Sequence, residues 1–147
     1  VIEKAGYVYL FETDIKWIKA LEATFEPWKN KVKIIQKYVS DKTSGQCIAL
    51  DDYFDDKQTI HFIKADVEGA EGQVLQGAAR LIDRHKNLKI AVCTYHRQED
   101  AAALESQLKN LGFKTSFSDG YMLYYYGKTN VVREPYLRKA VLRAVKG

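Results

Sequence analysis

The sequence predicts an α/β fold built on a doubly wound, mostly parallel sheet, and three observations support this prediction. β-prone apolar runs alternate with segments of helical spacing along the chain, as in parallel sheets with helical crossovers. The stretch from Ile60 to Ile82 begins as a short strand and passes through a glycine-containing turn into a helix. Asp119-Gly120 is a strong hairpin signal, which adds an antiparallel strand at one edge.

The composition is typical of a globular domain. The chain has 147 residues, 46% of them apolar and 29% charged, which is enough for one domain with a sizeable core. No apolar run approaches the roughly 18 residues of a membrane span, and the first residues lack the pattern of a signal peptide. Cys47 and Cys93 fit no metal-binding spacing and suggest a reducing compartment, so we expect a cytoplasmic protein.

The net charge of +4 is concentrated at one end. Six basic residues and one acid follow residue 127, so the remainder of the chain is nearly neutral. Charge alone therefore gives no reason to expect a nucleic-acid partner.

The first half of the chain reads as strands with one long helix between them. Tyr7 to Phe11 is a continuous β-prone run, and Glu12 follows at its carboxyl end. Asp14 is placed to cap a helix that stops near Pro27. The next expected elements are a strand at 32–39, a turn at 40–45 and a short strand at 47–50.

The second half continues the alternation after the helix that we expect at about 70–82. A buried strand at 89–95 ends at His96, and a helix follows at about 99–111 with Gly112 suited to its C-terminal cap. The last expected elements are strands at 113–118 and 121–126, joined by the hairpin, and a basic helix at roughly 136–145.

Three glycines invite comparison with a phosphate-binding loop. Gly69, Gly72 and Gly77 do not have the spacing of a dinucleotide fingerprint, and the neighbouring acids Glu68 and Glu71 would repel phosphate. We therefore do not expect a phosphate-binding loop here.

At this point the residues resemble a known family. The segment from Phe62 to Ala78, FIKADVEGAEGQVLQGA, looks like the signature of the FkbM-type S-adenosylmethionine-dependent methyltransferases. Companion motifs also appear in order along the chain, at 8–14, 38–45, 48–54, 93–101 and 119–125. The resemblance runs from residue 1 to about 127, so we divide the chain into a partial methyltransferase domain at 1–127 and a basic tail at 128–147, which we expect to be helical.

The family pattern includes a first strand and a glycine-rich loop that this sequence does not supply. The resemblance implies a Rossmann-like class I methyltransferase sheet of order 3-2-1-4-5-7-6, closed by an antiparallel C-terminal hairpin, in which strand 1 is central. Without that strand, strands 2 and 4 either pair directly or leave a gap with unpaired backbone groups. We therefore expect an N-terminally incomplete domain whose residues 1–147 bind the cofactor weakly or not at all.

Several polar residues are candidates for contacts with the cofactor. Glu12 stands where a doubly wound fold places an acid that accepts hydrogen bonds from ribose hydroxyls. Ser40 and Asp41 are placed to meet the adenine edge. The alternatives are a solvent-exposed acid at a helix start for Glu12 and an ordinary turn for Ser40 and Asp41.

Asp66, Glu68 and His96 form the candidate catalytic group. They follow two strands that are expected to be neighbours, so their side chains can converge at one edge of the sheet. His96 is the candidate base for a hydroxyl acceptor, and Asp66 and Glu68 are expected to position the cofactor and the acceptor. A structural hydrogen bond for His96 and a helix-terminal acid for Asp66 are the alternatives. One histidine and two acids can also bind a divalent metal, but no spacing demands it and we assign no metal ligand.

The resemblance implies an S-adenosylmethionine-dependent O-methyltransferase that acts on a hydroxyl of a sugar or another small secondary metabolite. A non-catalytic Rossmann-like binding or interaction module is the alternative. A nicotinamide-dependent Rossmann enzyme would share an acid on the ribose, but the terminal hairpin and the pair Asp66 and Glu68 argue against it.

Overall fold

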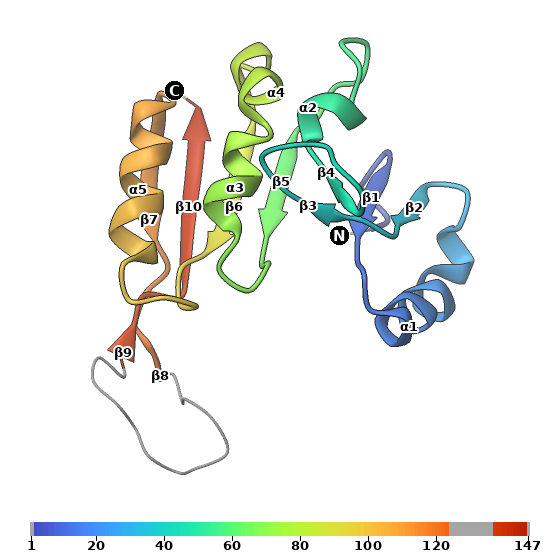
Figure 1. Ribbon diagram of the computed structural model, residues 1–147, viewed down its shortest axis with the longest axis horizontal. Coiled ribbons are helices and arrows are strands. Elements are labelled where there is room, and N and C mark those ends of the chain that lie inside the picture. Colours follow the sequence, from blue (N-terminus) through green and yellow to red (C-terminus); the bar gives the residue numbers. More distant parts are fainter. Residues whose placement is uncertain (1, 124–136, 147) are drawn as a thin grey trace.

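The computed structural model describes residues 2–123 and 137–146 (Figure 1). Its first half contains β1 (Val8–Phe11), α1 (Ile15–Phe25), the 3-10 helix η1 (Glu26–Trp28), β2 (Val32–Ile35), β3 (Tyr38–Val39), β4 (Cys47–Ile48) and α2 (Leu50–Tyr53). Its second half contains β5 (Phe62–Ala65), α3 (Glu71–Gln76), α4 (Ala79–Arg84), β6 (Lys89–Cys93), α5 (Asp100–Asn110), β7 (Phe113–Phe117), β8 (Met122–Leu123), β9 (Leu137–Arg138) and β10 (Val141–Lys146).

The largest sheet has four strands in the order β5-β6-β10-β7. β5 and β6 are parallel, and β10 is antiparallel to both of its neighbours. β1 and β2 form a separate parallel pair, and no ladder joins β1 to β5 among the described residues. The predicted α/β class with an antiparallel C-terminal strand is therefore confirmed, and strands 8–11 and 62–65 leave a gap instead of pairing directly.

The antiparallel strand in the sheet comes from residues 141–146, whereas the sequence predicted it at residues 121–126. We expected a helix at 136–145, but residues 141–146 form β10, which lies between β6 and β7. β8 pairs with β9 and not with β7, so the hairpin predicted across Asp119-Gly120 is wrong. The part of the expected returning strand at 124–126 lies outside the described residues. In β10 the alternate residues Leu142 and Ala144 are buried, which is a strand pattern.

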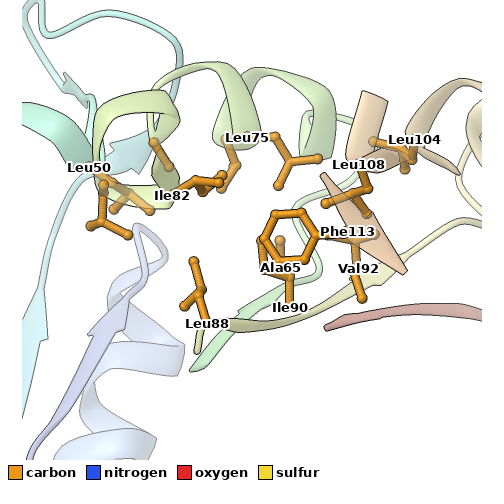
Figure 2. Close-up of a cluster of buried hydrophobic side chains, with 14 of the residues drawn as sticks. Leu50, Ala65, Leu75, Ile82, Leu88, Ile90, Val92, Leu104, Leu108 and Phe113 are labelled. Atoms are coloured by element: carbon orange, nitrogen blue, oxygen red, sulfur yellow. The ribbon is translucent and has the colours of Figure 1, made fainter. Parts of the chain in front are cut away.

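The core fills the space between the four-stranded sheet and the helices α3, α4 and α5, which lie on one face of that sheet (Figures 1 and 2). Leu75 and Ile82 point from the helices toward Ile90 and Val92 on β6 (Figure 2). The opposite face of the sheet carries exposed apolar side chains, Phe62 and Val145 among them.

Two predicted elements are interrupted. The strand expected at 32–39 is divided into β2 and β3, and the helix expected at about 70–82 is divided into α3 and α4 near Gly77. A Cβ atom at Gly77 would collide with the backbone carbonyl oxygen of Ser40, so this glycine permits the close approach of the turn after β3.

α1 follows its prediction closely. The Asp14 carboxylate accepts a hydrogen bond from the Lys16 amide at 2.8 Å, and Ile18 is the buried residue of the helix. No helix in the described part of the chain combines the length and the apolar character needed to cross a membrane.

Candidate active site

The candidate site lies where β5 and β6 end. Because these strands are parallel, their carboxyl ends meet at one edge of the sheet, which is also the side toward which the chain leaves β1 for α1 (Figure 1). Asp66 follows β5 directly, and residues 94–96 follow β6. Between Asp66 and α3, the backbone turns at Glu68 and Gly69, whose φ angles are +54° and +89°. A positive φ is costly for a residue other than glycine, so this turn is held in a strained conformation that places Glu68 beside His96.

Three carboxylates lie around the imidazole of His96, a side chain that is 5% exposed. Its Nε2 lies 3.1 Å from Asp66 Oδ1 and 3.3 Å from Glu71 Oε1, and its Nδ1 lies 3.4 Å from Glu68 Oε2. The predicted group of Asp66, Glu68 and His96 therefore does come together in the structure. A fourth member, Glu71, joins it from the first turn of α3.

Hydrogen bonds from neighbouring groups fix these carboxylates. The Tyr95 hydroxyl donates to Asp66 Oδ1 at 2.9 Å, and the Val67 amide donates to Glu71 Oε1 at 2.9 Å. Burial alone would raise the pKa of Asp66, but the hydrogen bonds from Tyr95 and His96 outweigh it and hold this pKa below its usual value. Burial and the hydrogen bond to Asp66 raise the pKa of the Tyr95 hydroxyl, so Tyr95 acts as a donor. Burial also raises the pKa of Cys93 to about 11.

Arg138 holds the segment that carries His96. This side chain is buried, and its Nη1 donates to the Tyr95 carbonyl at 2.6 Å and to the His96 carbonyl at 2.9 Å. On the other side of His96, the Arg97 amide donates to Asp100 Oδ2 at 2.6 Å. The backbone of residues 95–97 is thus fixed by one side chain from β9 and one from α5.

The other predicted site residues lie elsewhere. Glu12 is at the carboxyl end of β1, where its Oε1 accepts hydrogen bonds from the Thr13 and Asp14 amides at 2.6 and 2.9 Å. Ser40 and Asp41 follow β3, and the Ser40 hydroxyl donates to Asp41 Oδ1 at 3.1 Å. Glu12 therefore follows the β1–β2 pair and Ser40 and Asp41 follow β3, and none of these hydrogen bonds involves His96.

A cavity of about 330 Å³ opens at Thr13, the residue that follows Glu12. Its lining comes from the residues after β1 and β2 and from the β3–β4 pair: Thr13, Gln36, Tyr38 and Gln46. Two amides, a hydroxyl and an aromatic ring provide hydrogen bonds and a stacking surface without a formal charge.

Sequence reasoning missed Glu71, Tyr95 and Arg138. An acid in the first turn of a helix is expected from the helix dipole, so Glu71 carried no distinct signal. Arg138 lay in a segment predicted to be a basic helix, which hid its role. Tyr95 was directly beside His96, and this proximity was the one available hint.

Comparisons with known proteins point to one family. The profile described as "Methyltransferase FkbM domain" matches residues 5–115. The chain is also similar in structure to the methyltransferase FkbM from Methylobacillus flagellatus KT, with a TM-score of 0.69 and 21% identity over 94% of this chain and 36% of that one. This chain therefore spans little more than a third of the length of that structure. No curated protein sequence is significantly similar to the chain.

Two further solved structures share the fold. SMU.1697c of Streptococcus mutans, in complex with SAH, aligns with a TM-score of 0.60 and 14% identity over 99% of this chain and 79% of that one. Precorrin-6y C5,15-methyltransferase from Geobacter metallireducens GS-15 aligns with a TM-score of 0.57 and 12% identity over 96% of this chain and 69% of that one. At such identities the similarity establishes the Rossmann-like fold.

Proposed function

The chain belongs to the FkbM methyltransferase family, and from this premise we propose that it carries the acceptor side of an S-adenosylmethionine-dependent O-methyltransferase. The proposed acceptor is a hydroxyl of a sugar or another small metabolite. The observation that carries the proposal is the convergence of one imidazole and three carboxylates where β5 and β6 end, the edge at which open α/β sheets bind ligands.

The residues near β1 fit the nucleoside part of the cofactor. The cavity at Thr13 offers the Gln36 and Gln46 amides and the Tyr38 ring, which suit an uncharged heteroaromatic group. Glu12 would accept hydrogen bonds from the ribose hydroxyls, and Ser40 and Asp41 would contact the adenine edge. Asp66 would lie toward the methionine part. When bound, S-adenosylmethionine supplies an electrophilic methyl group on a positively charged sulfur.

His96 is the proposed base. A hydrogen on Nε2 is donated to Asp66 Oδ1, which leaves the lone pair on Nδ1. The only carboxylate against Nδ1 among the described residues is that of Glu68, whose side chain is 91% exposed and free to move aside. An acceptor hydroxyl that takes the place of this carboxylate would give its proton to Nδ1. Bound S-adenosylmethionine would supply the methyl group for the acceptor oxygen, and the electron pair of the broken carbon–sulfur bond would stay on sulfur.

The carboxylates have separate tasks in this proposal. Asp66 and Glu71 stabilise the imidazolium that forms when Nδ1 takes the proton, because both lie within hydrogen-bonding or ion-pairing distance of Nε2. Glu68 positions the acceptor, since it lies on the solvent side of the ring.

The test uses the natural protein that contains this chain. Turnover of S-adenosylmethionine is measured against a panel of hydroxylated sugars and small metabolites for the wild type, His96→Ala and His61→Ala. We expect His96→Ala to lower turnover by about 100-fold or more, as loss of a general base does. His61 is exposed and outside the cluster, so His61→Ala should keep wild-type turnover. Equal turnover in wild type and His96→Ala would overturn the assignment of the base.

A further inference from the structure

Three of the four side chains in the cluster have the arrangement of a metal site. One ligand atom each from Asp66, Glu71 and His96 lies within 4.8 Å of the other two. The distances of 3.1 and 3.3 Å from His96 Nε2 to the two carboxylates are compatible with neighbouring positions around one ion, because ligands at about 2.1 Å in a right-angle arrangement lie about 3 Å apart.

A second observation points to a missing cation. The Glu71 side chain is only 1% exposed, and its Oε2 has no hydrogen-bond partner among the described residues. Its Oε1 already accepts from the Val67 amide. A buried carboxylate oxygen without a partner is costly, and a bound cation is one of the few groups that can satisfy it.

The surroundings of the three ligands also suit a metal. Metal-bound histidines usually donate their other ring nitrogen to a carboxylate, and Glu68 Oε2 lies against His96 Nδ1 at 3.4 Å. The Tyr95 hydroxyl and the Val67 amide hold the two carboxylates by hydrogen bonds. One imidazole and two carboxylates match the first-row divalent ions, Zn²⁺ among them, and leave a coordination position open.

We propose that Asp66, Glu71 and His96 form a binding site for a divalent transition-metal ion, and that the bound ion switches off the base. The ion takes a lone pair on His96 Nε2, and the single ring hydrogen moves through solvent from Nε2 to Nδ1. Nδ1 then donates this hydrogen to Glu68, and it no longer accepts a proton from an acceptor hydroxyl. The inhibitory part of this inference rests on the function proposed above, whereas the binding site does not.

The binding site is tested on the 147-residue chain with Zn²⁺ alone, by calorimetry. We expect one ion per chain for the wild type and an affinity at least about tenfold weaker for Glu71→Gln and for Asp66→Asn. Glu105→Gln is the matched control, because Glu105 pairs with Lys109 on α5 and should bind Zn²⁺ as the wild type does. Thermal unfolding without the ion verifies that each variant folds, and Asp66→Asn remains informative if Glu71→Gln does not fold.

The site is overturned if the wild type binds no Zn²⁺ or if folded Glu71→Gln and Asp66→Asn both bind it as tightly as the wild type. Cobalt substitution supplies a further check, since a thiolate absorption band would assign the ion to Cys47 or Cys93 and overturn the site.

The inhibitory role is tested in the natural protein, where Zn²⁺ should lower methyl transfer and a chelator should restore it. Stimulation by Zn²⁺ would overturn the role of His96 as base and leave the binding site standing. Absence of Zn²⁺ binding together with loss of turnover in His96→Ala would overturn the binding site and leave the role of His96 as base standing.

Discussion

The N-terminal unit (residues 8–35, with β1, α1, η1 and β2) and the C-terminal unit (residues 62–123 and 137–146, with the four-stranded sheet) differ in how they are packed. The N-terminal unit contributes Ile18 and Val32 as its buried apolar side chains, whereas the C-terminal unit supplies most of the core cluster. The His96 cluster lies entirely in the C-terminal unit, and Glu12 lies in the N-terminal one. Proton transfer and nucleoside binding are thus proposed for regions of unequal packing.

This difference in packing indicates that the His96 cluster and the region around Glu12 should differ in rigidity. The carboxylates of Asp66 and Glu71 beside His96 are held by hydrogen bonds, and Arg138 holds the backbone of residues 95 and 96. Among the described residues, the hydrogen bonds of Glu12 come from the backbone of its own turn. Local stability follows the number of buried apolar contacts, so we expect the N-terminal unit to open more readily.

The largest expected effect comes from removing a central core side chain of the C-terminal unit. Leu142 is completely buried on β10, and Leu142→Ala should lower the free energy of unfolding by about 3–5 kcal/mol. Ile18→Ala removes the same number of carbon atoms from the N-terminal unit and should cost about 2 kcal/mol, because the site is at the edge of the packed region. Urea unfolding measures both, and equal losses would contradict the difference in packing.

A smaller effect is expected where the turn after β3 meets the C-terminal unit. Gly77→Ala brings a Cβ against the Ser40 carbonyl and should destabilise the protein by about 1–3 kcal/mol. Gly72→Ala is the control, because its Cβ would lie 3.4 Å from the side-chain amide oxygen of Gln107 and the change should alter stability by less than about 1 kcal/mol. Thermal unfolding of the two variants checks this. An unchanged midpoint for Gly77→Ala would show that the turn after β3 moves away from the added methyl group without loss of stability.

Helix caps give a third comparison between the units. Asp51 accepts hydrogen bonds from the Arg80 and Leu81 amides at the start of α4, whereas Asp14 accepts one from Lys16 at the start of α1. We expect Asp51→Ala to cost about 1–2 kcal/mol and Asp14→Ala about 0.5–1 kcal/mol. The midpoints of urea unfolding rank the two, and a larger loss for Asp14→Ala would reverse the comparison.

The smallest perturbation is chemical labelling of the native protein. Cys93 is buried in the C-terminal unit and Cys47 is partly exposed in the β3–β4 pair, so iodoacetamide should label Cys47 well before Cys93. Mass spectrometry of the peptides measures the order. Labelling of both thiols at one rate would indicate that β6 opens as easily as the β3–β4 pair.

Much of the fold could be predicted because local signals agreed with the tertiary structure. Asp14 caps the start of α1, and Pro27 lies just after its end. Gly112, with a φ of +82°, follows the C-terminal cap of α5. The tail was mispredicted because Leu, Ala, Arg and Lys favour a helix in isolation, while two neighbouring strands impose the extended conformation on residues 141–146. The alternation of Leu142, Arg143 and Ala144 was the signal for a strand.

The candidate site was predictable in part for the same reason. Asp66 and His96 follow strands whose parallel pairing could be foreseen, so their meeting was expected. Glu71 reaches His96 only because the turn at Glu68 and Gly69 adopts positive φ angles, and such a turn is not specified by residue type alone. The cavity at Thr13 depends on the division of one predicted strand into β2 and β3.

The position of β10 between β6 and β7 also has a consequence for biosynthesis. β6 and β7 are made early, but they are joined only through a strand that is translated about 25 residues after β7 ends. While the ribosome still holds residues 141–146, both strands present bare hydrogen-bonding edges, and Phe113 and Val92 lack the side chains that later cover them. A nascent chain stalled before residue 141 should therefore recruit chaperones, and the emergence of residues 141–146 from the ribosome should be the event that completes the sheet.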